Sequence, residues 1–222
     1  MAQLRQQFTA ELEQLRLQVE LMAVRVDQNL ERMRDVLRSG DAELAQLAIG
    51  CDDDIDRMNV SLTERCYDLL ARESPVASDL RFIVSVLRVL SELERIGDLS
   101  LRVDKEVDAH DLLRCDEVAF DVLQAMADEA LDRYRTALRA WATMDLDLAT
   151  ALARDNRTMD RFYERLMAEI VRYDGPEPVR VAIVVTAVGR ALERIGDHSS
   201  IIGARLRYLI TGDPDHLAAE VR

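Results

Sequence analysis

Apolar side chains recur every three to four positions over most of the chain, and turn-forming residues interrupt this pattern at only a few places. Such spacing is typical of amphipathic α-helices. The interruptions are Ser39-Gly40, Ser74-Pro75, a polar stretch at 109–115 and the turn at 174–178. Between them the pattern predicts six long helices, over residues 2–38, 41–73, 77–108, 116–143, 145–173 and 178–211.

Short connections between long amphipathic helices favour antiparallel neighbours in up-down bundles. We therefore predict an all-α fold made of two tandem three-helix bundles of long antiparallel helices. The first bundle is expected to span residues 1–110 and the second residues 111–212, with a C-terminal tail at 213–222. Asp41 and Asp145 are placed to cap the N-termini of the second and fifth helices.

An internal duplication supports two similar units. The hexapeptide LERIGD occurs at residues 93–98 and again, unchanged, at 192–197. Each copy lies near the middle of a long helical pattern that begins just after a proline, and each follows a helix with closely spaced acids. Repeats of this kind indicate that one supersecondary unit occurs twice.

Charge narrows the range of partners. The chain has 29 Lys and Arg against 42 Asp and Glu, a net charge of −13. Such a balance repels nucleic acid and anionic lipid. The longest apolar run, at 181–188, is far shorter than the roughly 20 residues that a membrane span needs. No secretory pattern begins the sequence and the three cysteines are an odd number, so we expect a cytoplasmic protein without nucleic acid partners or membrane insertion.

Two acidic pairs occur on helix faces that are otherwise apolar. Glu94 and Asp98 are four positions apart and therefore project from the face that also carries Leu90. Glu193 and Asp197 repeat this arrangement in the second unit. A carboxylate removed from water needs a positive partner or several hydrogen-bond donors. The pattern therefore predicts that a cation, an arginine or several hydrogen-bond donors lie beside each pair.

The preceding helices carry matching acids. Asp52 and Asp56 are four apart in the first unit, whereas the corresponding turn of the second unit has Asp155, Asn156 and Asp160. Oxygen ligands from two facing helices suit Mg, Ca, Mn or Fe, and suit zinc less well. The candidate metal ligands are Asp52, Asp56, Glu94, Asp98, Asp160, Glu193 and Asp197.

Other interpretations of these residues stay open at this point. Arg95, Arg194 or arginines of neighbouring helices could neutralise the acids as buried ion pairs. His198, next to the second motif, is an additional candidate ligand. A ferritin-like metal enzyme needs Glu-x-x-His, but Gly97 and Gly196 stand at the histidine positions. A structural coiled-coil scaffold would require heptads that continue across the proline-containing joins.

Three segments together resemble the PhoU family: PVASDLR at 75–81 and the two LERIGD copies. The resemblance extends from about Phe8 to Gly212. It implies two three-helix bundles with E(D)xxxD motifs on two helices of each, which bind metal clusters in some members. The matching positions are Asp52 with Asp56, Glu94 with Asp98, Asp160 alone, and Glu193 with Asp197.

The chain departs from the family pattern at three positions. Asn156 stands where the family motif has an acid, and Arg102 and Ile201 stand where the family often has asparagine. The resemblance therefore implies a complete carboxylate set in the first bundle and a thinner one in the second.

The resemblance also implies a function. PhoU proteins are non-enzymatic, cytoplasmic negative regulators of phosphate uptake and phosphate-starvation signalling. They act as adaptors that contact the ATPase of the phosphate-specific ABC transporter and its sensor histidine kinase. By this resemblance we expect the same partners here, with Fe, Mn, Mg or Zn as the bound metal, and a homodimer is left open.

Overall fold

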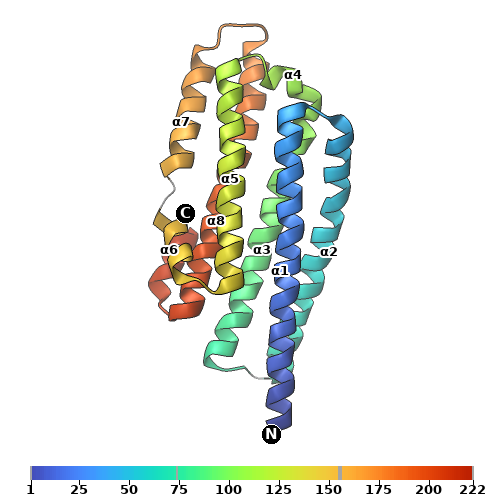
Figure 1. Ribbon diagram of the computed structural model, residues 1–222, viewed down its shortest axis with the longest axis vertical. Helices are drawn as coiled ribbons and strands as arrows, with labels where there is room; N and C mark the ends of the chain where they lie inside the picture. Colours follow the sequence, from blue (N-terminus) through green and yellow to red (C-terminus); the bar gives the residue numbers. More distant parts are fainter. Residues whose placement is uncertain (1, 74, 155–156, 222) are drawn as a thin grey trace.

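The computed structural model describes residues 2–73, 75–154 and 157–221, and these residues form helices and short connections without a β-strand (Figure 1). The all-α prediction is confirmed. The helices are α1 Ala2–Ser39, α2 Ala42–Glu73, α3 Ala77–Asp104, α4 His110–Leu113, α5 Glu117–Thr143, α6 Leu146–Arg154, α7 Arg157–Arg172 and α8 Pro178–Thr211, with the 3-10 segments η1 Lys105–Ala109 and η2 Pro214–Val221.

The helices form two three-helix bundles that lie side by side along their length. Helices α1, α2 and α3 pack on one another, and α5, α8 and the pair α6–α7 form the second bundle. Helix α3 runs beside α8, and α1 runs beside α5, so the bundles share a long interface (Figure 1). The LERIGD copies lie on α3 and α8, the two helices that meet at this interface.

Side-chain caps begin the helices where the sequence predicts them. Asp41 Oδ1 accepts a hydrogen bond from the Leu44 amide at 3.1 Å, at the start of α2. Asp145 Oδ1 accepts one from the Leu148 amide at 3.0 Å, at the start of α6. Each bond satisfies an amide that has no partner within its helix. Both predicted caps are confirmed.

Helices α6 and α7 occupy the described parts of the segment that was predicted as one helix over 145–173. Helix α6 ends at Arg154 and α7 begins at Arg157. Asp155 and Asn156, which we had weighed as second-bundle candidates, lie outside the described residues.

The connection between the bundles also differs from the prediction. Helix α3 ends at Asp104, and η1 and α4 occupy part of the expected polar joint. His110, at the start of α4, is buried and its Nε2 lies 3.0 Å from the Leu37 carbonyl oxygen of α1. This contact anchors the connection to the first bundle. At the other end of the chain, the expected tail forms η2, which packs on α8.

Polar contacts between α1 and α5 join the bundles. The buried Tyr134 hydroxyl donates to the Ala23 carbonyl oxygen at 2.6 Å. Arg135 binds Asp27 through Nε at 2.8 Å and Nη2 at 3.1 Å, and it also pairs with Glu31. Bidentate arginine–carboxylate pairs fix orientation as well as contributing attraction. Among the described residues, no helix is long and apolar enough to cross a membrane.

Candidate functional site

Helices α2 and α3 bring the first pair of acidic motifs together. Gly97 of α3 faces α2, and a Cβ placed there would lie 3.4 Å from Asp52 Oδ1 and 3.7 Å from the Ile55 side chain. The missing side chain leaves room for α2 to approach. Asp52 thereby reaches the same region as Glu94 and Asp98.

These acids lie at the boundary between the bundle interior and solvent. Asp52 is only 9% exposed, Glu94 and Asp98 are half-buried, and Asp56 is exposed. The cluster, which we call the first carboxylate cluster (Asp52, Asp56, Glu94 and Asp98), therefore opens to solvent on the side of Asp56.

Burial and mutual repulsion act on the first carboxylate cluster. Burial is the largest cause of the raised pKa of Asp52, and the charges of Asp56 and Asp98 add to it. Lys105 partly opposes this shift. The pKa of Glu94 is also raised, first by burial and then by the charges of Asp98 and Asp56. A cation placed among these groups would relieve the repulsion.

In the part of the chain that the structure describes, no protein cation pairs directly with this cluster. Among the described residues, the side chains of Asp52, Glu94 and Asp98 have no hydrogen bond and no ion-pair partner within 4.0 Å. Arg95, a candidate partner from the sequence, is exposed and lowers the pKa of Glu94 through its charge alone. Half-buried carboxylates without arginine partners are the donor chemistry that hard metal ions bind.

The side chains of the cluster are nevertheless not gathered around one point. In the described part of the chain, no three Asp, Glu, His or Cys side chains are close enough to hold one ion together. In this arrangement an ion would contact one or two carboxylates and keep several water ligands, which Mg²⁺ accepts readily. The carboxylates therefore suit a hard cation by their chemistry, whereas the described side chains do not converge on one position.

Asp104 is a further buried acid close to the cluster, and it lies outside both predicted motifs. Its side chain is 1% exposed, and its pKa is raised to about 7, mainly by burial. The charge of Asp52 contributes to the rise, whereas Arg32 opposes it. Asp104 Oδ1 has no hydrogen-bond partner among the described residues. A carboxyl in this position takes up a proton near neutral pH.

The second bundle places an arginine at the equivalent point. A Cβ at Gly196 of α8 would lie 3.5 Å from Cδ and Nε of Arg133 and 3.6 Å from Met159. Arg133, on α5, is 5% exposed. Its Nη2 donates to Ser200 Oγ at 2.6 Å and to the Leu152 carbonyl oxygen at 3.3 Å. Where Gly97 faces a carboxylate, Gly196 therefore faces a buried guanidinium.

The acids of the second bundle also have arginine neighbours. Glu193 pairs with Arg190 one turn earlier on α8, and this hydrogen bond is the main reason that the pKa of Arg190 is raised. The charge of Asp197 contributes to the same rise. Asp160 is exposed on α7. The second bundle thus carries its own positive charges beside the motif, as the ion-pair interpretation expects, and its described residues do not fit a metal.

His198 faces the other bundle and not the carboxylates of its own motif. Its Nδ1 lies 2.6 Å from Glu92 Oε2 of α3, and both side chains are buried. Arg88 Nη2 lies 2.9 Å from the other Glu92 oxygen. The structure therefore assigns His198 to the interface between α3 and α8.

Comparisons with known proteins follow the same two-fold division. The PhoU domain family matches the chain twice, over residues 19–107 and 123–206. The phosphate-specific transport system accessory protein PhoU homolog of Pseudomonas putida is 33% identical over 213 residues, covering 93% of this chain and 82% of that protein. The accessory protein PhoU of Escherichia coli is 30% identical, with coverage of 93% and 86%.

Solved structures agree over nearly the whole chain. The crystal structure of PhoU from Pseudomonas aeruginosa superposes with a TM-score of 0.88 at 32% identity, covering 93% of this chain and 100% of that one. The phosphate transport system regulatory protein PhoU from Streptococcus pneumoniae superposes with a TM-score of 0.83 at 28% identity, with coverage of 93% and 98%. These relatives are named as accessory or regulatory proteins, in agreement with the prediction of a non-enzymatic role.

Proposed function

Because the chain belongs to the PhoU family, we propose that it is an accessory protein that regulates phosphate transport. The observation that carries this proposal is the pair of PhoU domains, which together cover most of the chain at residues 19–107 and 123–206. Each domain carries the acidic LERIGD motif, the first on α3 and the second on α8. We therefore assign the regulatory role to the two bundles together and not to one of them.

The proposed mode of action is protein binding. We expect the chain to contact the ATPase of a phosphate ABC transporter and the sensor histidine kinase of the same system, in the cytoplasm, and to repress the starvation response when phosphate is plentiful. A net charge of −13 favours partners with basic surfaces. The Tyr134–Ala23 and Arg135–Asp27 contacts hold the second bundle against the first. A partner protein would therefore meet the surfaces of the two bundles in a fixed relative position.

Metal binding is proposed for the first bundle alone. One or two carboxylates of Asp52, Asp56, Glu94 and Asp98 would bind the ion directly, with water as the other ligands, and the candidates remain Fe, Mn, Mg and Zn. A bound cation would supply the positive charge that these carboxylates lack and thereby stiffen the packing of α2 on α3. In the second bundle Arg133 and Arg190 already supply positive charge.

Deletion of the gene tests the regulatory role. The deletion strain should express its phosphate-uptake genes in phosphate-rich medium, and a plasmid copy of the intact chain should restore repression. Expression that stays repressed in a strain without a second PhoU-family gene would contradict the proposal. Co-purification with the ATPase of the phosphate transporter, compared with the ATPase of an unrelated ABC transporter, tests the partner.

A further inference from the structure

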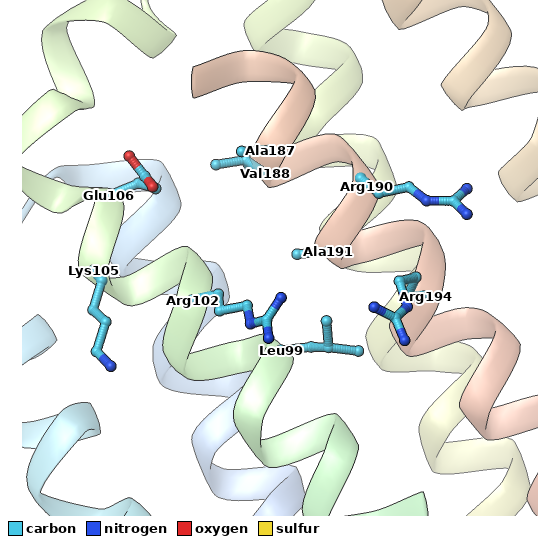
Figure 2. A pocket seen from close by; sticks show the side chains of 9 residues that line it. All are labelled: Leu99, Arg102, Lys105, Glu106, Ala187, Val188, Arg190, Ala191 and Arg194. Carbon is cyan, nitrogen blue, oxygen red and sulfur yellow. The ribbon is translucent and has the colours of Figure 1, made fainter. Parts of the chain in front are cut away.

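A cavity of about 350 Å³ lies between α3 and α8, where the two repeats meet (Figure 2). Small apolar side chains cover much of its wall. They come from both helices and are Leu99, Ala187, Val188 and Ala191. A volume of this order is within the range of small-molecule sites, which are typically about 300–1,000 Å³.

The rim of this cavity is strongly basic although the whole chain is acidic. Four cationic side chains line it, against the single carboxylate of Glu106. They are Arg102, Lys105, Arg190 and Arg194. The chain as a whole has 29 basic and 42 acidic residues, so this local excess of positive charge is opposite to the average surface. Such a concave cluster attracts anions.

Two of the four cationic side chains already interact with carboxylates. Lys105 extends away from the cavity (Figure 2), and its charge lowers the pKa of Asp52 in the first carboxylate cluster. Arg190 also points outward and pairs with Glu193. These two side chains therefore offset the acids of the two motifs.

The other two cations have no such partner. Among the described residues, Arg102 and Arg194 make no ion pair within 4.0 Å, and both are exposed. Their guanidinium groups extend toward each other from α3 and α8, over Leu99 (Figure 2). Two positive groups that share a cavity repel each other, and an anion between them removes this repulsion.

We propose that Arg102 and Arg194 form a binding site for a small anion that carries a phosphate group. Two planar guanidinium groups match the geometry of phosphate oxygens and bind them by paired hydrogen bonds. The apolar wall offers a surface for an organic part of the same molecule. A protein partner is disfavoured because a specific interface needs about 800 Å² on each side, whereas nine residues of α3, η1 and α8 line this cavity.

The site goes beyond the proposed regulatory function and does not depend on it. Ligand binding is a property of the purified chain alone, and regulation is measured in the cell. If the deletion strain keeps its repression, the binding experiment still tests whether the purified chain binds a phosphate-bearing anion. If no ligand binds, the regulatory proposal is unaffected.

Isothermal titration of the purified chain with two probes tests the site. Inorganic phosphate and ATP are titrated separately, in magnesium-free buffer containing a chelator. We expect at least one probe to bind with a dissociation constant below about 1 mM, because a few charge-assisted hydrogen bonds provide enough free energy for binding of this strength. Tighter binding of ATP would indicate an organic phosphate, and equal or tighter binding of inorganic phosphate would indicate the free ion.

Two variants and a control locate the binding. Arg102→Ala and Arg194→Ala should each lower the affinity for the probe by about tenfold or more, because a charge-assisted hydrogen bond is lost. Arg180→Ala removes the same charge from an exposed position of α8 outside the cavity and should change the affinity less than twofold. Both cavity arginines are exposed, so circular dichroism should show the variants folded. Absence of binding by both probes, or equal weakening by Arg180→Ala, would overturn the site.

Discussion

His198 Nδ1 of α8 lies 2.6 Å from Glu92 Oε2 of α3, and this buried pair joins the two repeats at their shared interface. Arg88 reaches the second Glu92 oxygen from the same helix, so the carboxylate has a positive or hydrogen-bonding group at each oxygen. Polar groups buried between helices stabilise one arrangement when every member has a partner. The pair thereby fixes the register of α3 against α8.

Removal of the histidine should destabilise the molecule. We expect His198→Ala to lower the free energy of unfolding by about 2–4 kcal/mol, because Glu92 would stay buried with one hydrogen-bond partner fewer. Urea denaturation followed by circular dichroism measures the change. His216→Ala, in η2 outside the interface, is the control and should cost less than about 1 kcal/mol. Equal effects of the two variants on the free energy of unfolding would show that the His198–Glu92 pair makes no specific contribution to stability.

Two helical glycines should respond in opposite directions to the same substitution. A Cβ at Gly203 would lie 3.2 Å from the Ala149 carbonyl oxygen and 3.2 Å from Leu152, whereas a Cβ at Gly50 would meet nothing within 4 Å. Alanine is favoured over glycine by about 1 kcal/mol in a helix interior. Gly50→Ala should therefore stabilise the fold by about 0.5–1 kcal/mol.

At Gly203 the crowding should outweigh that gain. The α6 backbone cannot move away without disturbing its packing on α8, so Gly203→Ala should destabilise the fold by about 1–2 kcal/mol. Thermal denaturation of the two variants in parallel measures the sign of each change. Stabilisation by both substitutions would contradict the close approach of α6 to α8.

Asp104 should make stability depend on pH. Its pKa in the folded chain is raised to about 7 from an ordinary value of 3.8. The folded state therefore holds this proton more tightly than the unfolded state does, and stability from this group is complete below pH 4 and is lost as the pH rises through 7. Each pKa unit corresponds to about 1.4 kcal/mol.

Asp104→Asn should remove this dependence. The variant is expected to be more stable than the original chain at pH 8, by about 1–4 kcal/mol, and to differ little at pH 4. Urea denaturation at both pH values, in the presence of a chelator, provides the measurement. Asp108→Asn, at an exposed position of η1, is the control. A parallel pH profile for Asp104→Asn and the original chain would contradict the buried, proton-binding carboxyl.

Arg133 should be structural in the second bundle. Arg133→Met leaves the Ser200 hydroxyl and the Glu129 carboxylate without the guanidinium, so we expect a loss of about 2–4 kcal/mol in the free energy of unfolding. Arg139→Met, an exposed position on the same helix, is the matched control and should change stability by less than about 0.5 kcal/mol. Similar effects of both substitutions would show that the buried contacts of Arg133 contribute nothing specific to the stability of the second bundle.

The sequence predicted the parts of the fold that local chemistry controls. The joins at Gly40, Pro75 and Pro178 and the caps at Asp41 and Asp145 carry their signals in single residues, and the structure has a helix boundary at each.

The buried polar partners were harder to predict because they depend on helix packing. Asp104 continues the seven-residue spacing of Ile83, Leu90 and Gly97 along the buried face of α3, so a signal for it was present in the sequence. No comparable signal marks Arg133, since its role depends on α5 approaching Gly196 of α8. Repetition of LERIGD predicted an acidic pair in each unit, with a thinner carboxylate set in the second bundle. The buried arginine beside the second motif was not predicted, because it comes from a neighbouring helix.

Metal analysis tests this difference between the repeats most directly. The chain is purified without chelator or metal-affinity resin, and its metal content is measured by elemental analysis beside two double variants. We predict bound metal in the original chain and in Glu193→Ala/Asp197→Ala, and its loss in Glu94→Ala/Asp98→Ala. An original chain without metal, or an unchanged metal content in Glu94→Ala/Asp98→Ala, would contradict a cation site in the first bundle.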